Sequence, residues 1–147
     1  TSSTIDSRSG DNASVLIAGN IILPSLNDGI LKMSAGDLFV IVNNVIVHSI
    51  GLGGAGHFAN NVVYGNVSGI QTMTVHNNLA IGGDYLPAGN GNINNQAEAD
   101  VFVLGASPDG KYKLKAGSPA LGAGTQDTQI HNLFVTKKPP TTWRHSL

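Results

Sequence analysis

The sequence predicts an all-β fold, a parallel β-helix in which about five to six short turns stack as a single-stranded solenoid. First, Asn44, Asn61, Asn78 and Asn95 follow one another at equal intervals, and each comes directly after another Asn. Second, this interval is only about half of the roughly 33 residues of known two-helix repeats. Third, the repeated segments are rich in Val, Ile, Asn and Gly, which suit strands and turns better than helices. Each unit is therefore expected to bury its apolar face against the next copy.

The repeat places the expected elements along the chain. An earlier copy contains Asn20, which lies further from Asn44 than the regular interval. The strand-bearing segments are expected at residues 15–23, 38–50, 57–67, 72–81 and 93–104. Two longer excursions leave the stack, one over residues 24–37 and one that begins at Asp84. The first excursion accounts for the longer step between Asn20 and Asn44.

A closing hairpin is predicted after the last repeat. Ser107-Pro108-Asp109-Gly110 is a strong turn signal, and the apolar segment before it ends at Leu104. In the segment 111–115 Lys alternates with Tyr112 and Leu114, which is typical of a strand with one buried face. The repeat is therefore expected to end in a closing strand.

Two regions follow from this division. Residues 1–124 are assigned to the β-helix turns with the closing strand, and residues 125–147 to an irregular C-terminal tail. The tail carries Pro139-Pro140 and the single Trp143 and shows no period. We expect it to lie across the last turn or to trail off.

The residues around each recurring Asn predict the core. The expected stacked positions, three before and two after the second Asn of each pair, are Ile17, Ile41, Phe58 and Val75, and Ile22, Ile46, Val63, Ala80 and Ala97. Strands stacked about 4.8 Å apart bring identical side chains into register, so inward Asn side chains can form a hydrogen-bonded ladder. The alternative is that Asn-Asn marks exposed turns, because Asn tolerates left-handed backbone geometry. We favour the ladder.

Composition supports one domain with an aliphatic core. Of the 147 residues, 12% are charged and 5% aromatic, while 19 are Gly. The net charge of -1 gives no general attraction to nucleic acid or to an anionic membrane, so neither is expected as a partner. The chain has no apolar run of about 18 residues and no signal-peptide pattern at its start, which predicts a soluble protein. The absence of Cys excludes disulfides and thiolate ligands.

Several motifs together carry a family resemblance. They are the Asn-Asn turns, Asp100-Val101-Phe102-Val103, Tyr112-Lys113-Leu114 and the segment Gly117-Ser118-Pro119-Ala120-Leu121-Gly122-Ala123-Gly124. Over residues 15–124 the chain resembles the C-terminal turns of secreted bacterial right-handed parallel β-helix proteins of the pectin-lyase-like superfamily. That superfamily includes polysaccharide lyases, glycoside hydrolases and uncharacterised surface proteins. The resemblance implies a secreted or cell-surface bacterial protein that is associated with carbohydrate.

This chain departs from the superfamily in two ways. Members are usually longer, and many carry an amphipathic helix over the N-terminal end of the stack, whereas residues 1–14 show no helical pattern and hence no visible cap. An uncapped end would expose unpaired backbone groups, which favours association. We therefore expect a C-terminal fragment of a longer β-helix that lacks its N-terminal part, a small stack capped by a partner, or one chain of a homo-oligomer.

A glycine motif raises the question of a nucleotide cofactor. Residues 51–56 match G-x-G-x-x-G and follow a strand-like run. Dinucleotide binding also requires a helix that starts at the last Gly and an acidic residue about 20 positions further on. The next residues, from His57, instead form the following strand and turn, so no cofactor is expected.

Histidines occur in successive turns. His48, His57 and His76 take different offsets from the second Asn of their repeats, so they do not form one column. No Cys cluster or H-E-x-x-H motif is present, and no metal site is expected. If one His acts as a general base, we favour His76, which strand alternation places outward from Val75.

Carboxylates and tyrosines give further candidates for chemistry. Glycoside hydrolysis needs two carboxyl groups about 5 to 9.5 Å apart, and Asp84 with either Glu98 or Asp100 is the best pair available. We favour a structural interpretation, in which Asp84 starts a turn and Asp100 binds backbone groups near the closing strand. A catalytic version predicts a groove along one sheet that is lined by His76, Tyr64 or Tyr85.

Three lysines share a face of the expected closing strand. Lys111, Lys113 and Lys115 alternate with apolar residues, so their amines point the same way. This face could bind an acidic polysaccharide. Lysines on a terminal strand also guard against edge-to-edge aggregation, and we prefer that interpretation.

The sequence leaves two hypotheses for function. In the first, the chain is a carbohydrate-associated β-helix module with a structural or binding role rather than a complete enzyme. In the second, it is a polysaccharide lyase or glycoside hydrolase that acts on a polymeric, possibly acidic, glycan. The missing acid, base and metal signatures favour the first hypothesis.

Overall fold

The computed structural model describes residues 5–6, 14–23, 31–32, 38–52, 54–105 and 111–125. Most of the first expected excursion lies outside these residues. So do the expected turn at 107–110, the tail from residue 126 onward and most of the N-terminal segment in which no cap was visible.

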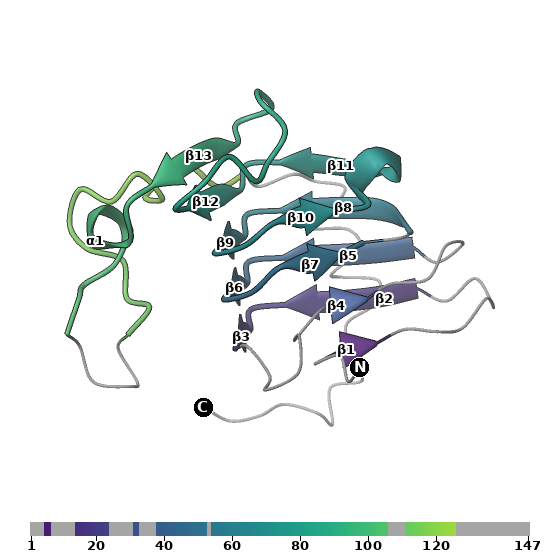
Figure 1. The fold of residues 1–147 in the computed structure, drawn as a ribbon, viewed down its shortest axis with the longest axis horizontal. Coiled ribbons are helices and arrows are strands. Elements are labelled where there is room, and N and C mark those ends of the chain that lie inside the picture. The colour runs from purple at the N-terminus through teal and green to yellow at the C-terminus, as the bar shows by residue number, and fades with distance from the viewer. Residues whose placement is uncertain are drawn as a thin grey trace.

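Three parallel sheets wrap around a common core (Figure 1). The first sheet contains β1 (Ile5–Asp6), β4 (Leu31–Lys32), β7 (Ile50–Gly51) and β10 (Val67–Ser68). The second contains β2 (Ser14–Ala18), β5 (Leu38–Val42), β8 (Ala55–Ala59) and β11 (Met73–His76). The third contains β3 (Ile21–Ile22), β6 (Val45–Ile46), β9 (Val62–Val63), β12 (Leu79–Ile81) and β13 (Ile93–Gln96). A 3-10 turn, η1 (Ile70–Thr72), and a short helix, α1 (Glu98–Val101), complete the described elements.

The sequence period sets the register of all three sheets. Leu38 pairs with Ala55 in the second sheet, Ile50 with Val67 in the first, and Val62 with Leu79 in the third. The partners in each pair are 17 residues apart, as Asn44 and Asn61 are, so equivalent residues of successive turns stand side by side. The predicted all-β parallel solenoid is therefore confirmed. In the described residues the stack completes about three turns, which is fewer than the five to six turns expected.

The final repeat differs from the sequence expectation. The segment predicted to continue as a strand to residue 104 instead ends at Gln96 and is followed by α1. The register between β12 and β13 also shifts, because Leu79 pairs with Ile93 but Ile81 pairs with Gln96. The last predicted segment is therefore a strand only in its first part.

The expected closing strand is likewise absent from the described residues. Its segment contacts the preceding chain through a single antiparallel bridge between Phe102 and Leu114. The predicted alternation is nevertheless kept, since Tyr112 and Leu114 are partly buried against a hydrophobic cluster while Lys111 and Lys113 are exposed.

The core is built from the columns that the repeat predicts. The inward residues of the second and third sheets that are at most 7% exposed include Ile17, Ile41, Phe58 and Val75, and Ile22, Ile46, Val63 and Ala80. Ala97 was expected in the same set, but it is exposed, because the chain has left the stack by that point. Aliphatic side chains stacked on their equivalents in the next turn fill most of the interior.

A ladder of Asn side chains runs along one corner of this core. Asn44, Asn61 and Asn78 are each 1% exposed. The Oδ1 of Asn61 accepts hydrogen bonds from the backbone N and the Nδ2 of Asn44, at 3.1 and 3.0 Å. Asn78 receives the same two bonds from Asn61, each at 3.0 Å. The ladder interpretation is thus confirmed for these turns.

The last rung of the ladder is not the residue that the period predicts. Asn78 donates from its backbone N and its Nδ2 to Oδ1 of Asn92, at 3.0 and 3.1 Å. Asn95, the expected partner, is exposed and has a φ of 54°. The step from Asn78 to the next rung is therefore 14 residues, whereas the step from Asn61 to Asn78 is 17 residues. The chain thus enters β13 sooner than the repeat implies.

Candidate functional site

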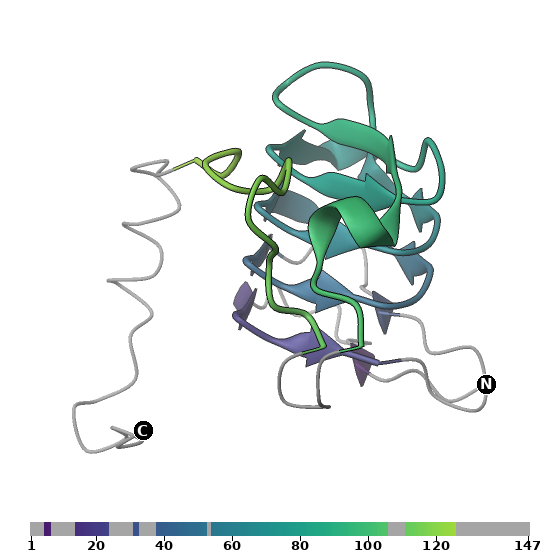
Figure 2. The same cartoon turned by 90° about the vertical axis from the view of Figure 1, so that its left-hand side faces the viewer.

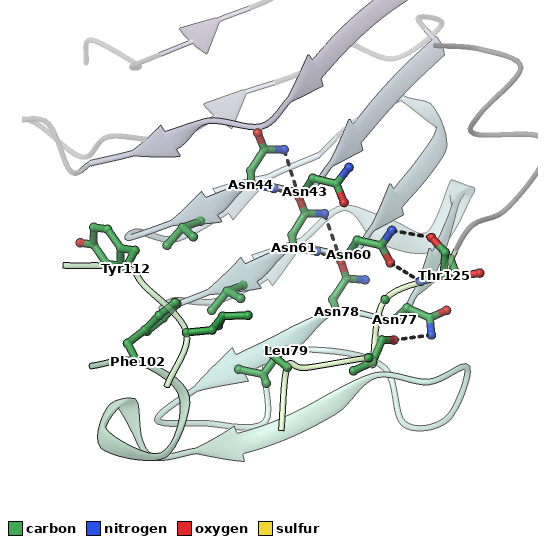
Figure 3. Close-up of a pocket in the computed structure, with 17 residues that line it drawn as sticks. Asn43, Asn44, Asn60, Asn61, Asn77, Asn78, Leu79, Phe102, Tyr112 and Thr125 are labelled. Carbon is green, nitrogen blue, oxygen red and sulfur yellow. Dashed lines mark hydrogen bonds between the residues drawn. The ribbon is translucent and has the colours of Figure 1, made fainter. Parts of the chain in front are cut away.

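A groove lies between the Asn corner of the stack and the C-terminal part of the described chain (Figure 3). Its volume is about 510 Å³. The base consists of outward residues at the starts of three strands of the third sheet, Val45, Val62 and Leu79. Residues 111–125 fold back across this side of the stack beside α1, as Figure 2 shows. The groove therefore joins segments that are far apart in the sequence.

Three Asn side chains form one wall of the groove. Asn43, Asn60 and Asn77 each directly precede a ladder Asn, and their φ values are 58°, 57° and 54°. This left-handed conformation is one that Asn adopts more readily than most residues. It turns the chain by one corner, so the first Asn of each pair faces out while the second faces in. We call these three residues the outer Asn column.

Two members of the outer Asn column bind the backbone of the C-terminal segment. Asn60 Oδ1 accepts a hydrogen bond from the backbone N–H of Thr125 at 2.8 Å, and its Nδ2 donates to the carbonyl oxygen of the same residue at 2.9 Å. Asn77 Nδ2 donates to the carbonyl oxygen of Ala123 at 2.9 Å. Asn43 is exposed, and its side chain forms no hydrogen bond with the described residues. Among the described residues, two of the three positions of the column are therefore bound to the C-terminal segment.

Aromatic residues form the opposite wall. Phe102 and Tyr112 line the groove, with ring centroids 5.5 Å apart and nearly perpendicular planes. Tyr64 completes the cluster, since its ring lies 6.4 Å from that of Phe102 and 6.3 Å from that of Tyr112. Such edge-to-face and offset arrangements add stability beyond the area they bury. The cluster fixes the C-terminal segment against the third sheet.

The groove lining is uncharged. The residues that contribute to it, all in the described part of the chain, include no Asp, Glu, His, Lys or Arg. Its polar groups are the amides of the Asn side chains, the backbone of residues 122–125, the hydroxyl of Thr125 and the phenol of Tyr112. The described lining can bind ligands by hydrogen bonding and apolar contact.

Tyr64, a candidate for chemistry from the sequence, has a structural role. Its hydroxyl donates a hydrogen bond to Glu98 Oε1 at 3.0 Å, which ties α1 to the stack. Burial, the hydrogen bond to Glu98, and the negative charges of Glu98 and ionised Tyr112 raise the pKa of the Tyr64 phenol well above its ordinary value. The phenol therefore stays protonated at neutral pH and is unsuited to act as a base.

The raised pKa of Tyr64 predicts a loss of stability in alkali. Below about pH 10 the phenol is protonated in both the folded and the unfolded chain, so it does not make the free energy of unfolding depend on pH. Above that pH the unfolded chain releases the proton while the folded chain keeps it, so stability falls by up to about 1.4 kcal/mol per pH unit. We expect the free energy of unfolding, measured with urea between pH 9 and 11.5, to fall less steeply with pH for Tyr64→Phe than for the wild type. Equal slopes would contradict this assignment.

None of the three described histidines lines the groove. His57 and His76 face outward on the second sheet, and their ring centroids are 6.2 Å apart. His76 Nδ1 lies 3.0 Å from Asn77 Oδ1, so His76 supports a member of the outer Asn column from behind. Its outward direction from buried Val75 agrees with the alternation expected from the sequence. His48 follows β6 in the third sheet and is partly buried.

The carboxylates have separate surroundings. Glu98 accepts the hydrogen bond from Tyr64, and Asp100 lies 3.5 Å from the Nζ of Lys115. Asp84 is exposed in the segment between β12 and β13, followed by partly buried Tyr85, which packs against the core cluster. Neither Asp84 nor Tyr85 lines the groove. The structure therefore gives Glu98 and Asp100 partners that hold the C-terminal segment in place.

The three lysines make different contacts. Lys111 Nζ lies 5.6 Å from the centroid of the Tyr112 ring, within the range of a cation–π contact. Lys113 is exposed. Lys115 Nζ donates to the carbonyl oxygen of Ala99 at 2.6 Å and so binds α1. Lys115 thus stabilises local structure, and Lys111 packs on the back of the aromatic wall.

Neither a metal centre nor a nucleotide loop emerges from the described residues. No group of three or more His, Asp or Glu in them is arranged to hold a metal ion. In the glycine motif, Gly56 lies inside β8 rather than at the start of a helix, so the motif lacks the helix N-terminus that would bind a pyrophosphate. Among these residues, no helix is long and apolar enough to cross a membrane.

A glycine beside the groove supports the outer Asn column. Gly91 has a φ of 73°, and a Cβ added there would lie 2.6 Å from Asn77 Nδ2. Gly19, with a φ of 69°, has nothing within 4 Å of such a Cβ. Both substitutions to Ala carry the cost of a left-handed conformation, about 1–2 kcal/mol. We expect Gly91→Ala to cost about 1 kcal/mol more than Gly19→Ala in urea unfolding, because it also displaces the Asn77 amide from Ala123. Equal costs would contradict this role.

Comparisons with known proteins assign no family to this chain. No protein-family model, no curated protein sequence and no solved structure matches it. The protein is a parallel β-solenoid, as its sheets show.

Proposed function

We propose that this protein is a carbohydrate-associated β-helix module that binds a polysaccharide and does not cleave it. The observation that carries the proposal is the uncharged groove, which combines amide groups on one wall with aromatic rings on the other. Ligand sites with a few fixed polar groups on a largely apolar surface are typical of binding proteins. A volume of about 510 Å³ suits a few sugar units.

The sequence motifs extend this proposal. The likeness to the C-terminal turns of pectin-lyase-like proteins supports a secreted or cell-surface bacterial setting and a polysaccharide as partner. A catalytic role as a lyase or glycoside hydrolase receives less support, because the groove lining lacks the acidic and basic groups that those reactions need. We propose no nucleic acid, membrane or cofactor as a partner.

The test is to fill the groove. Ala120 lines it and is partly buried, whereas Ala99 lies exposed in α1 and outside it. A panel of neutral and acidic polysaccharides is titrated into the wild type by calorimetry, and reducing ends and unsaturated products are assayed in parallel. We expect one class of polysaccharide to bind to the wild type without being cleaved. Ala120→Trp should abolish this binding, and the control Ala99→Trp should keep it. Binding that survives Ala120→Trp, binding by none of the polymers, or cleavage of a polymer would overturn the proposal.

We also propose that the first turn of the stack takes part in assembly, as one chain of a homo-oligomer or as a continuation of a longer β-helix. Ile21 and Leu23, at the outermost strand of the third sheet, are 56% and 55% exposed. Exposed apolar residues on an edge strand are a recognised route to association. Light scattering should give a mass above that of a monomer, and the double change Ile21→Lys with Leu23→Lys should restore the monomer. A monomeric wild type would contradict self-assembly.

A further inference from the structure

We propose that the C-terminal segment, residues 126–147, binds an apolar face on the outside of the second sheet and shields it from other molecules. The inference goes beyond the proposed function, because it assigns an interaction surface on another side of the stack. Three observations carry it: the apolar character of this outward face, its burial, and the path of the chain up to Thr125.

The outer side of the second sheet is apolar in its first three strands. Val40 and Val42 point outward, because the residues that alternate with them in β5 belong to the core cluster. The register places the outward residues of neighbouring strands side by side. We call the apolar cluster that they form the outer apolar face, and its members are Leu16, Ala18, Val40, Val42 and Ala59.

The outer apolar face is buried. Val42 and Ala59 have no exposed surface, and Val40 is 5% exposed. Within the described part of the chain, the hydrophobic residues that pack against these three are Leu16 and Ala18, which stand on the same face. Neighbours on one face of a sheet cover only the flanks of a side chain, whereas full burial takes a second layer about 10 Å away. The outer apolar face therefore requires such a layer.

The described chain ends beside this face and runs toward it. Ala123 is bound by Asn77, and Thr125 is bound by Asn60, one turn nearer the N-terminal end of the stack (Figure 3). The chain therefore moves down the stack by one turn over these residues. Asn60 directly follows Ala59 of the outer apolar face. A continuation in the same direction reaches the part of the face that belongs to the earlier turns.

The segment that follows has the length and the composition to form the cover. It contains 22 residues, from 126 to 147, while each other segment outside the described residues has at most seven. An extended chain advances about 3.3 Å per residue, so about three residues span three strands that are about 4.8 Å apart. Residues 128–136 include no Asp, Glu, Lys or Arg, and their hydrophobic members are Ile130, Leu133, Phe134 and Val135.

The cover has two consequences for the molecule. An apolar face left open on the second sheet would be a patch of the kind that drives association, so the segment keeps this side of the stack from binding other molecules. The segment is also continuous with residues 122–125, whose backbone lines the groove. Its docking therefore holds one side of the groove in place.

The first experiment measures how fast single Cys residues react with a thiol reagent in the full chain, which has no Cys of its own. Val42→Cys is expected to react at least about tenfold more slowly than Thr74→Cys, an exposed position on the same side of the sheet, because its reaction needs a local opening. The triple change Ile130→Lys, Leu133→Lys and Phe134→Lys should raise the rate at Val42→Cys at least about tenfold, because it removes the cover.

Two controls make this result specific. The changes Gln126→Lys, Gln129→Lys and Thr136→Lys add the same charge at polar positions of the segment and should leave Val42→Cys slow. Ile41→Cys points into the core and should stay protected in both triple variants. Fast labelling of Val42→Cys in the otherwise wild-type chain would overturn the inference. Slow labelling after the three changes at hydrophobic positions, with Ile41→Cys still protected, would overturn it as well.

Cross-linking identifies the occupant directly and decides the question even where a Lys variant fails to fold. Leu16→Cys is combined in turn with one Cys at each position from 130 to 135, and the full chain is oxidised. We expect at least one pair to form a disulfide within a single chain. A disulfide that forms only between two chains would show that a second copy covers the face. No disulfide at any position would show that this segment does not reach it, and either result would overturn the inference.

Discussion

Asn61→Ala is expected to destabilise the fold by about 2–6 kcal/mol, because it removes a hydrogen-bond partner from each of two buried backbone groups. In the wild type the carbonyl oxygen of Ile41 accepts from Asn61 Nδ2 at 2.9 Å, and the backbone N of Asn44 donates to Asn61 Oδ1 at 3.1 Å. Ala offers neither group. Since a domain is stable by only about 5–15 kcal/mol, this loss is a large part of the total.

Urea unfolding followed by far-UV circular dichroism measures this effect. The matched control is Asn66→Ala, because Asn66 is exposed and its side chain has no place in the ladder. A surface substitution of this kind is expected to change the free energy of unfolding by no more than about 0.5 kcal/mol. A loss below about 1 kcal/mol for Asn61→Ala would show that the ladder is not needed for stability.

Phe58→Ala is expected to cost about 3–5 kcal/mol, because it opens a cavity in the middle of the stack. Phe58 has no exposed surface, and it lies between Ile41 of the turn before and Val75 of the turn after. The parallel strands on either side are hydrogen-bonded to fixed neighbours, so the walls have little freedom to collapse into the space. The cost should therefore fall at the upper part of this range.

Two further variants test the account of Phe58 by the same unfolding experiment. Phe58→Leu keeps most of the volume and should cost less than about 2 kcal/mol. Thr74→Ala changes an exposed residue of the neighbouring strand and serves as the control. If Phe58→Ala and Phe58→Leu were equally stable, the position would be loosely packed and the assignment of this column to the core would be wrong.

The repeating part of the fold could be predicted from the sequence because identical environments select identical residues. The inward columns that contain Ile41 and Phe58, and the ladder of Asn44, Asn61 and Asn78, follow from the period and from the spacing of parallel strands. Where the environment repeats, a local pattern is enough. The number of turns was overestimated, and the last expected segment, 93–104, is a strand only as far as Gln96.

The end of the ladder shows where periodicity misleads. Asn94-Asn95 matches the repeat in letters and in spacing, yet Asn92 forms the last rung. A better signal was present, since Gly91-Asn92-Ile93 has the same pattern as Gly19-Asn20-Ile21 in the first turn. In both places a left-handed Gly replaces the outer Asn. Comparing these two segments would have found the change in step.

The groove could not be predicted, because it depends on contacts between distant parts of the chain. The bonds from Asn60 to Thr125 span 65 residues, and Tyr64 meets Glu98 across 34. Neither the C-terminal segment nor α1 belongs to the repeat, so no periodic signal shows where they lie. The sequence candidates His76, Tyr85 and Asp84 were chosen for their chemical type, whereas the groove is lined in part by Asn amides for which the sequence predicted a structural role.

The shared step of the three sheets has a consequence for how such a chain can change in length. The central turns advance by 17 residues in every sheet, as the ladder does from Asn44 to Asn61 and on to Asn78. Adding or removing one such block would therefore bring each remaining strand beside a partner with the same pattern. One residue more or less within a strand would reverse the inward and outward faces of the rest of that strand. The protein can thus grow or shrink by duplication in whole units while its ends, which carry the distinctive surfaces, remain unchanged.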